Sequence, residues 1–450
     1  MKRGSLVSIV AFGLMGLIGL AALAACRHSD GAQTEIAKWQ DGKSAAVSLT
    51  YDDNSANQFR VAVPLMTRLG LPATFHIITG EIAGSRYAGA FIGRPLGEIV
   101  RETSRLPTGP GNLFERASAI ARLPFQGAFD YHLRAGEAYE EGRTAEACAL
   151  IDEGFAKVRS GGLRPLPAPS AERQGDHLSW DDLKALAAQG FEFSSHTITH
   201  PRLAVLDDAN LDYELEKSRE DILDHLGPKH TFTVECPFGT EDERVVRHAL
   251  ARYPASRNRL PEPFLEELNR GSEKDPAAST QEYVQWQRGA LTATPMAVMK
   301  GWVDTIARRD NVWLVLVFHG VDGIGWEPKT GAELEEYFGY IKSLEGRLWV
   351  ATFQDAVKYM RERMAARVTT IRKGASIEVD LRHGLPTAIY DLPLTLKTRV
   401  PRSWRSVEVR QAGLVSETAP VRDDERGAYV LYRAVPNSGP VSLFGVGPQQ

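Results

Sequence analysis

Cysteine is scarce in this chain, since only Cys26, Cys148 and Cys236 occur among its 450 residues. So few cysteines exclude a disulfide-rich scaffold. Cys148 lies in a helix-patterned stretch, where we expect a small buried apolar residue. Cys148 and Cys236 are available to pair with each other, but the sequence alone does not show that their Cα atoms approach closely enough.

An excess of either charge is also missing. The formal net charge is -4 at pH 7, and the chain contains no cluster of basic residues. Nucleic acid is therefore not an expected partner. The composition is ordinary for a globular protein, and the length allows one large core with a second, smaller one.

The one long uncharged apolar run lies at the N-terminus, where residues 6–25 follow a basic start. This pattern is typical of a secretory signal. Simple secretion and an uncleaved membrane anchor are the alternatives. The sequence Leu23-Ala24-Ala25-Cys26 resembles the lipobox of bacterial lipoproteins, which implies a signal peptide over residues 1–25 and lipidation of Cys26. Arg27 after this cysteine favours, by the same resemblance, a lipid-anchored protein in the outer membrane or periplasm.

Short apolar runs alternate with helical patterns from residue 45 onward. Strands that alternate with helices imply a parallel sheet, so the pattern predicts an α/β fold with enough units for a barrel. In such barrels the chemistry lies at the C-terminal ends of the strands. The expected strands are residues 45–50, 73–78, 191–194, 231–234, 312–318 and 348–351, and the expected helices are residues 61–69, 183–189, 211–226, 295–309, 334–344 and 353–367.

Three stretches depart from this alternation. Residues 26–43 are polar, and we expect a tether there. Residues 80–173 show no strand pattern but contain helical patterns, which predicts a helical insertion because a long structureless loop is unusual. After residue 367 short strands are separated by turn residues, which predicts an all-β, sandwich-like domain over residues 368–450.

Two motifs far apart in the chain offer metal ligands. Asp52 and Asp53 directly follow the first expected strand, while His196 and His200 follow the third. One carboxylate with two imidazoles suits zinc or a similar divalent ion, and the second carboxylate would lie beside a metal-bound water as a general base. A solvated turn and a pair of surface histidines are the alternatives.

Two further strand ends carry groups of chemical interest. His319 closes the most apolar expected strand, either as a general acid or as a buried core histidine. Cys236-Pro237-Phe238-Gly239 follows another strand. This segment is either a turn with a buried cysteine or a rigid groove wall whose backbone N–H faces a developing oxyanion.

Together these motifs resemble those of the polysaccharide deacetylase family, the NodB-homology carbohydrate esterases. The resemblance spans residues 45–364 and implies an incomplete (β/α) barrel over residues 44–367. It implies that Asp52 is the catalytic base and His319 the acid, and that the backbone N–H of Phe238 helps to stabilise the oxyanion. It also implies three metal ligands, namely Asp53, His196 and His200.

The chain departs from the family pattern in two places. Glu235 stands where the third motif often has an arginine that orients the base. Arg257, after the next expected strand, is a candidate replacement, and a surface arginine is the alternative. The spacing from Asp53 to His196 is long for the family. Trp326 follows His319 and, with Pro237 and Phe238, is expected to belong to the substrate groove. A sugar ring can stack on Trp326 at the rim, and packing of this tryptophan within its loop is the alternative.

The resemblance implies a metal-dependent hydrolase that removes acetyl groups from an envelope or extracellular polysaccharide. An N-acetylglucosamine-type amide is the main expected substrate, and an O-acetyl ester of the xylan type is the second. Zinc is the expected metal, with cobalt, nickel and manganese as alternatives. Two other functions stay open, a cyclic amide or imide hydrolase on the same barrel and a non-catalytic glycan-binding lipoprotein.

Overall fold

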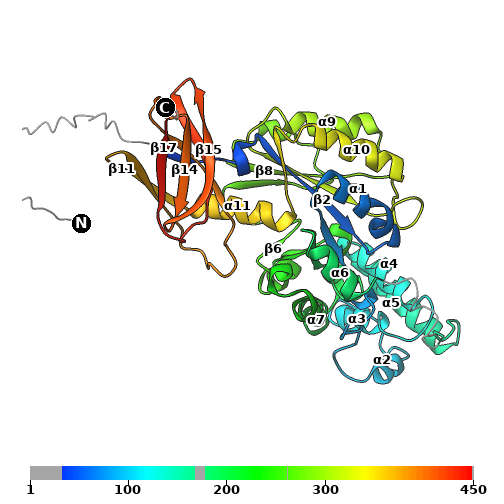
Figure 1. The fold of residues 1–450 in the computed structure, drawn as a ribbon. Coiled ribbons are helices and arrows are strands. Elements are labelled where there is room, and N and C mark those ends of the chain that lie inside the picture. The colour runs from blue at the N-terminus through cyan, green and yellow to red at the C-terminus, as the bar shows by residue number, and fades with distance from the viewer. Residues whose placement is uncertain (1–32, 168–177, 261, 448–450) are drawn as a thin grey trace, which may run out of the picture.

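The computed structural model describes residues 33–167, 178–260 and 262–447 (Figure 1). The expected signal peptide and Cys26 lie outside these residues. Within the described ranges no helix is both long enough and apolar enough to cross a membrane.

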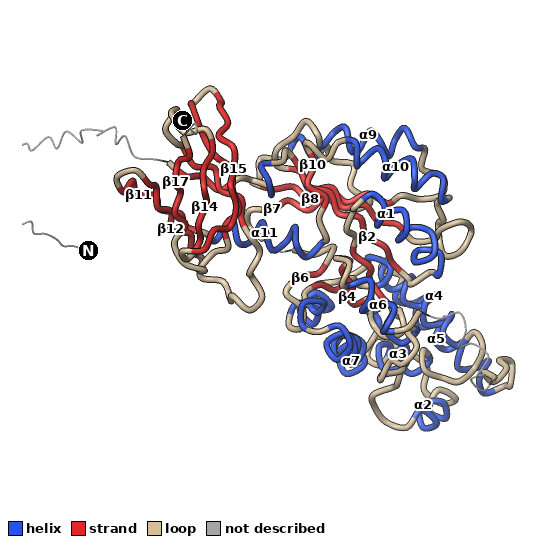
Figure 2. The backbone as a smooth tube through the Cα atoms, viewed as in Figure 1, coloured by secondary structure: helices blue, strands red, loops and turns tan. Residues whose placement is uncertain are grey.

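A parallel sheet forms the centre of the α/β part (Figure 2). Its strand order is β6-β5-β4-β3-β2-β9-β8-β7, and β10 pairs with the first half of β2. Among the described residues no pairing joins β6 to β7, so the barrel is incomplete, which confirms the expected fold class. The strands are β2 (Ala45–Asp52), β3 (Thr74–Ile77), β4 (Glu192–Ser195), β5 (Thr233–Val234), β6 (Ala255–Ser256), β7 (Leu265–Leu268), β8 (Tyr283–Gly289), β9 (Val312–Phe318) and β10 (Leu348–Val350).

The middle of this sheet is buried on both faces. All residues of β9 are buried, with Leu314 and Leu316 in one apolar cluster and Trp313 and Val315 in another. This explains the continuous apolar run of β9, because helices cover both faces of a parallel sheet. The covering helices are α1 (Val63–Leu69), α6 (Trp180–Ala187), α7 (Asp208–Leu226), α8 (Glu243–Leu250), α9 (Met296–Ile306), α10 (Gly331–Ser343) and α11 (Phe353–Ala365).

The expected insertion is helical and has its own core. It contains α2 (Leu96–Glu102), α3 (Leu113–Ile120), α4 (Ala128–Glu140) and α5 (Thr144–Arg159). Apolar side chains such as Ile120, Ile151 and Phe155 form a separate cluster between these helices. In Figure 1 the insertion lies at the end of the molecule opposite the C-terminal β domain.

The C-terminal part is a curved, nearly closed antiparallel sheet. Its order is β1-β13-β16-β15-β14-β17-β12-β11, around a core that includes Val379, Leu396 and Val430. The strands are β11 (Arg367–Lys373), β12 (Ser376–Arg382), β13 (Leu394–Arg399), β14 (Ser406–Gln411), β15 (Leu414–Asp424), β16 (Gly427–Ala434) and β17 (Val441–Val446).

The eighth strand of this sheet corrects the expected tether. β1 (Thr34–Ile36) comes from the segment 26–43 and pairs with β13. Trp39 follows it, fully buried, and its ring nitrogen donates a hydrogen bond to the Asp310 carbonyl at 2.9 Å. Residues 33–43 are therefore part of the folded protein, and the prediction of a tether is wrong for them. Paired backbone and a buried tryptophan hold them in place.

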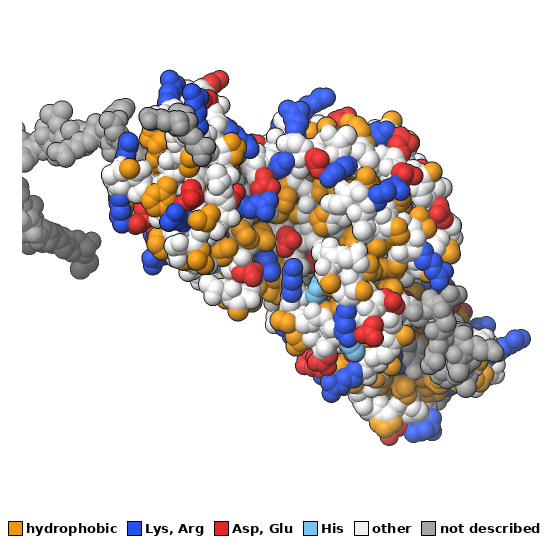
Figure 3. Space-filling model, in the orientation of Figure 1, with side chains coloured by type: hydrophobic (Ala, Val, Ile, Leu, Met, Phe, Trp, Pro, Cys, Tyr) orange, Lys and Arg blue, Asp and Glu red, His pale blue; other side chains and the backbone are white. Residues whose placement is uncertain are grey.

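Charged side chains of both signs are mixed over the face shown in Figure 3, with no large area of one sign. This mixture agrees with the near-neutral charge of the sequence.

Candidate active site

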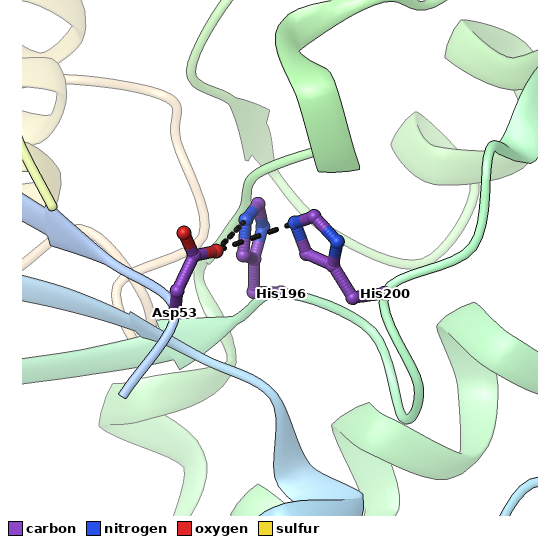
Figure 4. A group of neighbouring side chains, drawn as sticks. All are labelled: Asp53, His196 and His200. Carbon is purple, nitrogen blue, oxygen red and sulfur yellow. Dashed lines mark ion pairs between the residues drawn. The ribbon is translucent and has the colours of Figure 1, made fainter. Parts of the chain in front are cut away.

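The carboxyl ends of β2 and β4 bring three predicted metal ligands together (Figure 4). Asp53 Oδ1 lies 3.5 Å from His196 Nε2 and 3.3 Å from His200 Nε2. One ligand atom from each residue lies within 4.8 Å of the others. His196 Nδ1 donates to the Glu235 carbonyl at 2.9 Å, which leaves the Nε2 lone pair free to bind a metal.

The charges of this group fit a cation. Asp53 Oδ1 is buried and has no hydrogen bond of normal geometry among the described residues. Burial alone would raise the pKa of Asp53, but the rings of His196 and His200 hold it well below its usual range. Burial lowers the pKa of His200, which favours the neutral imidazole that metals bind. An ionised carboxylate beside two imidazoles is a donor set that suits a divalent ion.

Asp52, the last residue of β2, is held in place by a buried arginine. Arg257 follows β6 and donates to Asp52 Oδ1 at 2.8 Å and to Oδ2 at 2.7 Å. Burial would raise the pKa of Asp52, but the Arg257 guanidinium holds it well below its usual range. The same guanidinium lies 2.8 Å from Glu235 Oε1. Arg257 is fully buried, so it is not a surface arginine.

His319 and Trp326 lie next to Asp52 at the end of β9. His319 follows β9, and its Nε2 lies 3.4 Å from Asp52 Oδ2. Burial lowers the pKa of His319, while the charge of Asp52 opposes this effect. The Trp326 ring meets the His319 ring edge-on at 4.5 Å and is 55% exposed. Trp326 therefore forms part of the rim and is not packed within its loop.

Phe238 contributes a strained turn to the site. Its backbone has φ of +66° in the short helical turn Pro237–Gly239. Its ring centroid lies 4.7 Å from that of His200. A non-glycine residue keeps such a conformation only where its surroundings enforce it. Pro237 is buried and does not line the cavity, so Phe238 alone of this predicted pair faces it.

A cavity of about 760 Å³ connects these groups. The sequence-predicted residues in its lining are Asp52, Asp53, His196, His200, Phe238, His319 and Trp326. Other lining residues were not predicted, namely Glu137, Glu140 and Glu141 of the insertion, together with Arg202 and Arg270. Of these, only Arg202 had a local signal, because it directly follows the His-Pro sequence of the second motif. Cys148 and Cys236 are both free and buried, and they do not pair.

Comparison with known proteins adds family evidence. Residues 155–254 match the profile of the family described as "Polysaccharide deacetylase". This region includes His196, His200 and Phe238. A gellan lyase from Bacillus sp is 28% identical over 299 residues, which are 61% of this chain but only 12% of that protein.

Two solved structures are among those that resemble the chain. One is a family 4 carbohydrate esterase from Streptomyces lividans in complex with acetate, at 12% identity and TM-score 0.30, covering 68% of this chain and 92% of that one. The other is a peptidoglycan deacetylase from Bacillus subtilis, at 11% identity and TM-score 0.31, covering 71% and 93%. Residues 155–254 are therefore similar to the polysaccharide deacetylase family, in a chain whose α/β part is an incomplete barrel with the predicted residues at its strand ends.

Proposed function

We propose that the protein is a metal-dependent hydrolase that removes acetyl groups from a polysaccharide. An N-acetylglucosamine-type amide is the favoured substrate, and an O-acetyl ester is the second choice. The observation that carries the proposal is the ion pair of Asp52 with Arg257. It lies next to the three predicted metal ligands, which are Asp53, His196 and His200. A base that is kept ionised beside a cation site is the equipment that metal-assisted hydrolysis needs.

Asp53, His196 and His200 would hold the divalent ion, with zinc the first candidate. When bound, such an ion polarises the acetyl carbonyl and acidifies a water molecule. Asp52 accepts the proton of the attacking water, and Arg257 keeps its carboxylate ionised and oriented.

The remaining groups act on the developing charge and on the leaving group. The backbone N–H of Phe238 donates a hydrogen bond to the oxyanion. His319, whose Nε2 lies 3.4 Å from Asp52 Oδ2, protonates the departing amine or alcohol. Trp326 offers an exposed ring face at the rim on which a sugar can stack.

The ion pair of Glu235 with Arg257 bears on the non-catalytic alternative. Glu235 is the main argument for a binding protein, because it replaces the usual motif arginine. Arg257 nevertheless supplies a guanidinium to Asp52 from a different strand end. This arrangement favours catalysis, since a glycan-binding protein has no use for an oriented base.

Export through an N-terminal lipid anchor is also part of the proposal. It rests on the sequence around Cys26. Metabolic labelling with a radioactive fatty acid tests it. Label is expected in the wild-type protein and is expected to be absent from Cys26→Ser.

Acetate release by the purified protein, with zinc or cobalt restored, tests the reaction. The substrate panel holds N-acetylated and O-acetylated glycans together with one cyclic imide. Asp52→Asn is expected to lose activity while it retains metal, and full activity in this variant would remove Asp52 from the mechanism. Imide hydrolysis without acetate release would support the rival hydrolase.

A further inference from the structure

Helix α4 of the insertion reaches the loop that carries the metal ligands. Glu140, its last residue, forms an ion pair with Arg202, and the two side chains are only 12% and 13% exposed. Gly136 allows this close approach, because a Cβ there would lie 2.6 Å from Arg202 Cδ. The insertion therefore holds the side chain that comes two residues after His200.

The same helix also fixes the Arg202 backbone. His132 Nε2 accepts a hydrogen bond from the Arg202 N–H at 3.0 Å, while its Nδ1 donates to the Ala117 carbonyl at 3.0 Å. Both bonds require the neutral imidazole tautomer, which agrees with a pKa that burial lowers to about 3. Arg202 is thus held at its backbone and at its guanidinium by one helix.

Arg202 in turn covers the strained turn at Phe238. Its Cζ lies 4.1 Å from the Phe238 ring centroid, in the geometry of a cation–π contact. Arg270 lies 3.4 Å from the Phe238 carbonyl and close against Gly239 of the same turn. Two guanidinium groups therefore contact the turn, and these contacts can maintain its unfavourable φ of +66°.

We propose that Glu140 and Arg202 are positioning residues that orient the Phe238 turn, and with it the backbone N–H that faces the oxyanion. The insertion is then a working part of the active site. The expected effect on catalysis rests on the proposed function, whereas the expected effect on the Phe238 turn does not. A planar guanidinium covers an aromatic face better than an ammonium, so lysine at position 202 is a poor substitute.

The test uses three variants, Glu140→Gln, Arg202→Met and Arg202→Lys, with Glu115→Gln as the matched control. Glu115 pairs with Arg94 within the same insertion and does not line the cavity. Protein labelled with ¹⁵N-phenylalanine gives a simple amide spectrum, in which the Phe238 resonance is the one missing from Phe238→Leu. We expect this resonance to shift in Glu140→Gln and Arg202→Met, and to stay in place in the control.

Kinetics at equal metal content supply the second measurement. Small displacement of a group that acts on the transition state costs up to about 100-fold in rate. We therefore expect kcat for acetate release to fall by about 10-fold or more in Arg202→Met with KM nearly unchanged, and to fall less in Glu140→Gln and Arg202→Lys.

The outcomes separate the two proposals. An unmoved Phe238 resonance in Glu140→Gln and Arg202→Met would overturn the inference, whatever the activity. A rise in KM at constant kcat would also overturn it, because Arg202 would then be a substrate contact. A shifted resonance in a protein that releases no acetate would refute the proposed function and leave the positioning role in place. If Arg202→Met does not fold, Glu140→Gln decides alone.

Discussion

Replacing Arg257 with methionine is expected to destabilise the protein in a pH-dependent way. The side chain donates two hydrogen bonds to Asp52 and also contacts Glu235, and all three groups are buried. Methionine takes this buried cation away from both carboxylates. Removal of one partner from a buried ion pair costs about 3–5 kcal/mol in unfolding free energy.

The direction of the pH effect follows from the pKa values. In the wild-type protein the pKa of Asp52 is far below normal, so its stabilising contribution is full at pH 5–8 and is lost only as the pH falls through that low value. In Arg257→Met the guanidinium no longer opposes the effect of burial, so the pKa of Asp52 and that of Glu235 both rise. Protonation of a buried carboxyl with a raised pKa stabilises the folded protein. The deficit in unfolding free energy of the variant should therefore shrink from pH 8 to pH 5.

Urea unfolding of the metal-free protein at pH 8 and at pH 5 measures this deficit. Arg68→Met is the control, because Arg68 and Glu335 form a pair that is 58% and 60% exposed. Exposed pairs contribute at most about 1 kcal/mol. The assignment of Arg257 as the cation that keeps Asp52 ionised would be refuted by either of two results. One is a loss of unfolding free energy in Arg257→Met as small as that in Arg68→Met, and the other is a loss that is equal at both pH values.

Three other predictions concern the metal ligands, the acid and the N-terminal segment. Asp53→Ala should leave the protein without stoichiometric zinc after dialysis, as measured by elemental analysis, whereas retained zinc would exclude Asp53 as a ligand. His319→Gln should lower kcat by about 10²–10⁴-fold at unchanged metal content, and a smaller effect on acetate release would remove it as the acid. Trp39→Ala should lower the unfolding free energy by about 3–5 kcal/mol, since the ring is fully buried; a change below about 1 kcal/mol in urea unfolding would argue for a loose tether.

The sequence predicts strands best where the sheet is buried on both faces. β9 was predicted over residues 312–318 and occurs there, because its seven residues form an uninterrupted apolar run. β8 was missed for the opposite reason. It carries Gln285 and Gln287, which are buried but donate hydrogen bonds to the Arg257 carbonyl and to Asn258. Polar strand residues whose hydrogen-bond partners lie elsewhere in the sequence cannot be distinguished from loop residues by local pattern.

The N-terminal segment was misjudged for a related reason. β1 has three residues, and its pairing partner β13 lies more than 350 residues further along the chain. A strand this short has no periodicity to detect. Trp39 was a signal that the prediction left unused, since a tryptophan in a polar stretch needs an apolar site somewhere in the fold.

The candidate site was predictable where each residue ends a strand. Asp52 ends β2, His196 and His319 directly follow β4 and β9, and strand ends of a parallel sheet meet on one side. Arg257 could be predicted only with a surface arginine as the open alternative, because β6 is two residues long. Glu140 and Arg270 were not predicted, since their relation to the site arises entirely from packing between distant segments.

The long spacing between Asp53 and His196 has a structural explanation. The insertion leaves the barrel after Ala83 and returns at Leu178, where the Ala83 N–H donates to the Leu178 carbonyl at 3.0 Å. Ser85 on the outgoing side accepts a hydrogen bond from Trp180 on the returning side. Because the two ends meet, residues can be added between them without moving β3 relative to β4, and the entropic cost of a longer loop grows only slowly. A long spacing between motifs is therefore only a weak argument against a shared site in this fold. The inserted helices present a surface to the cavity, and changes in that surface can alter the substrate or the rate.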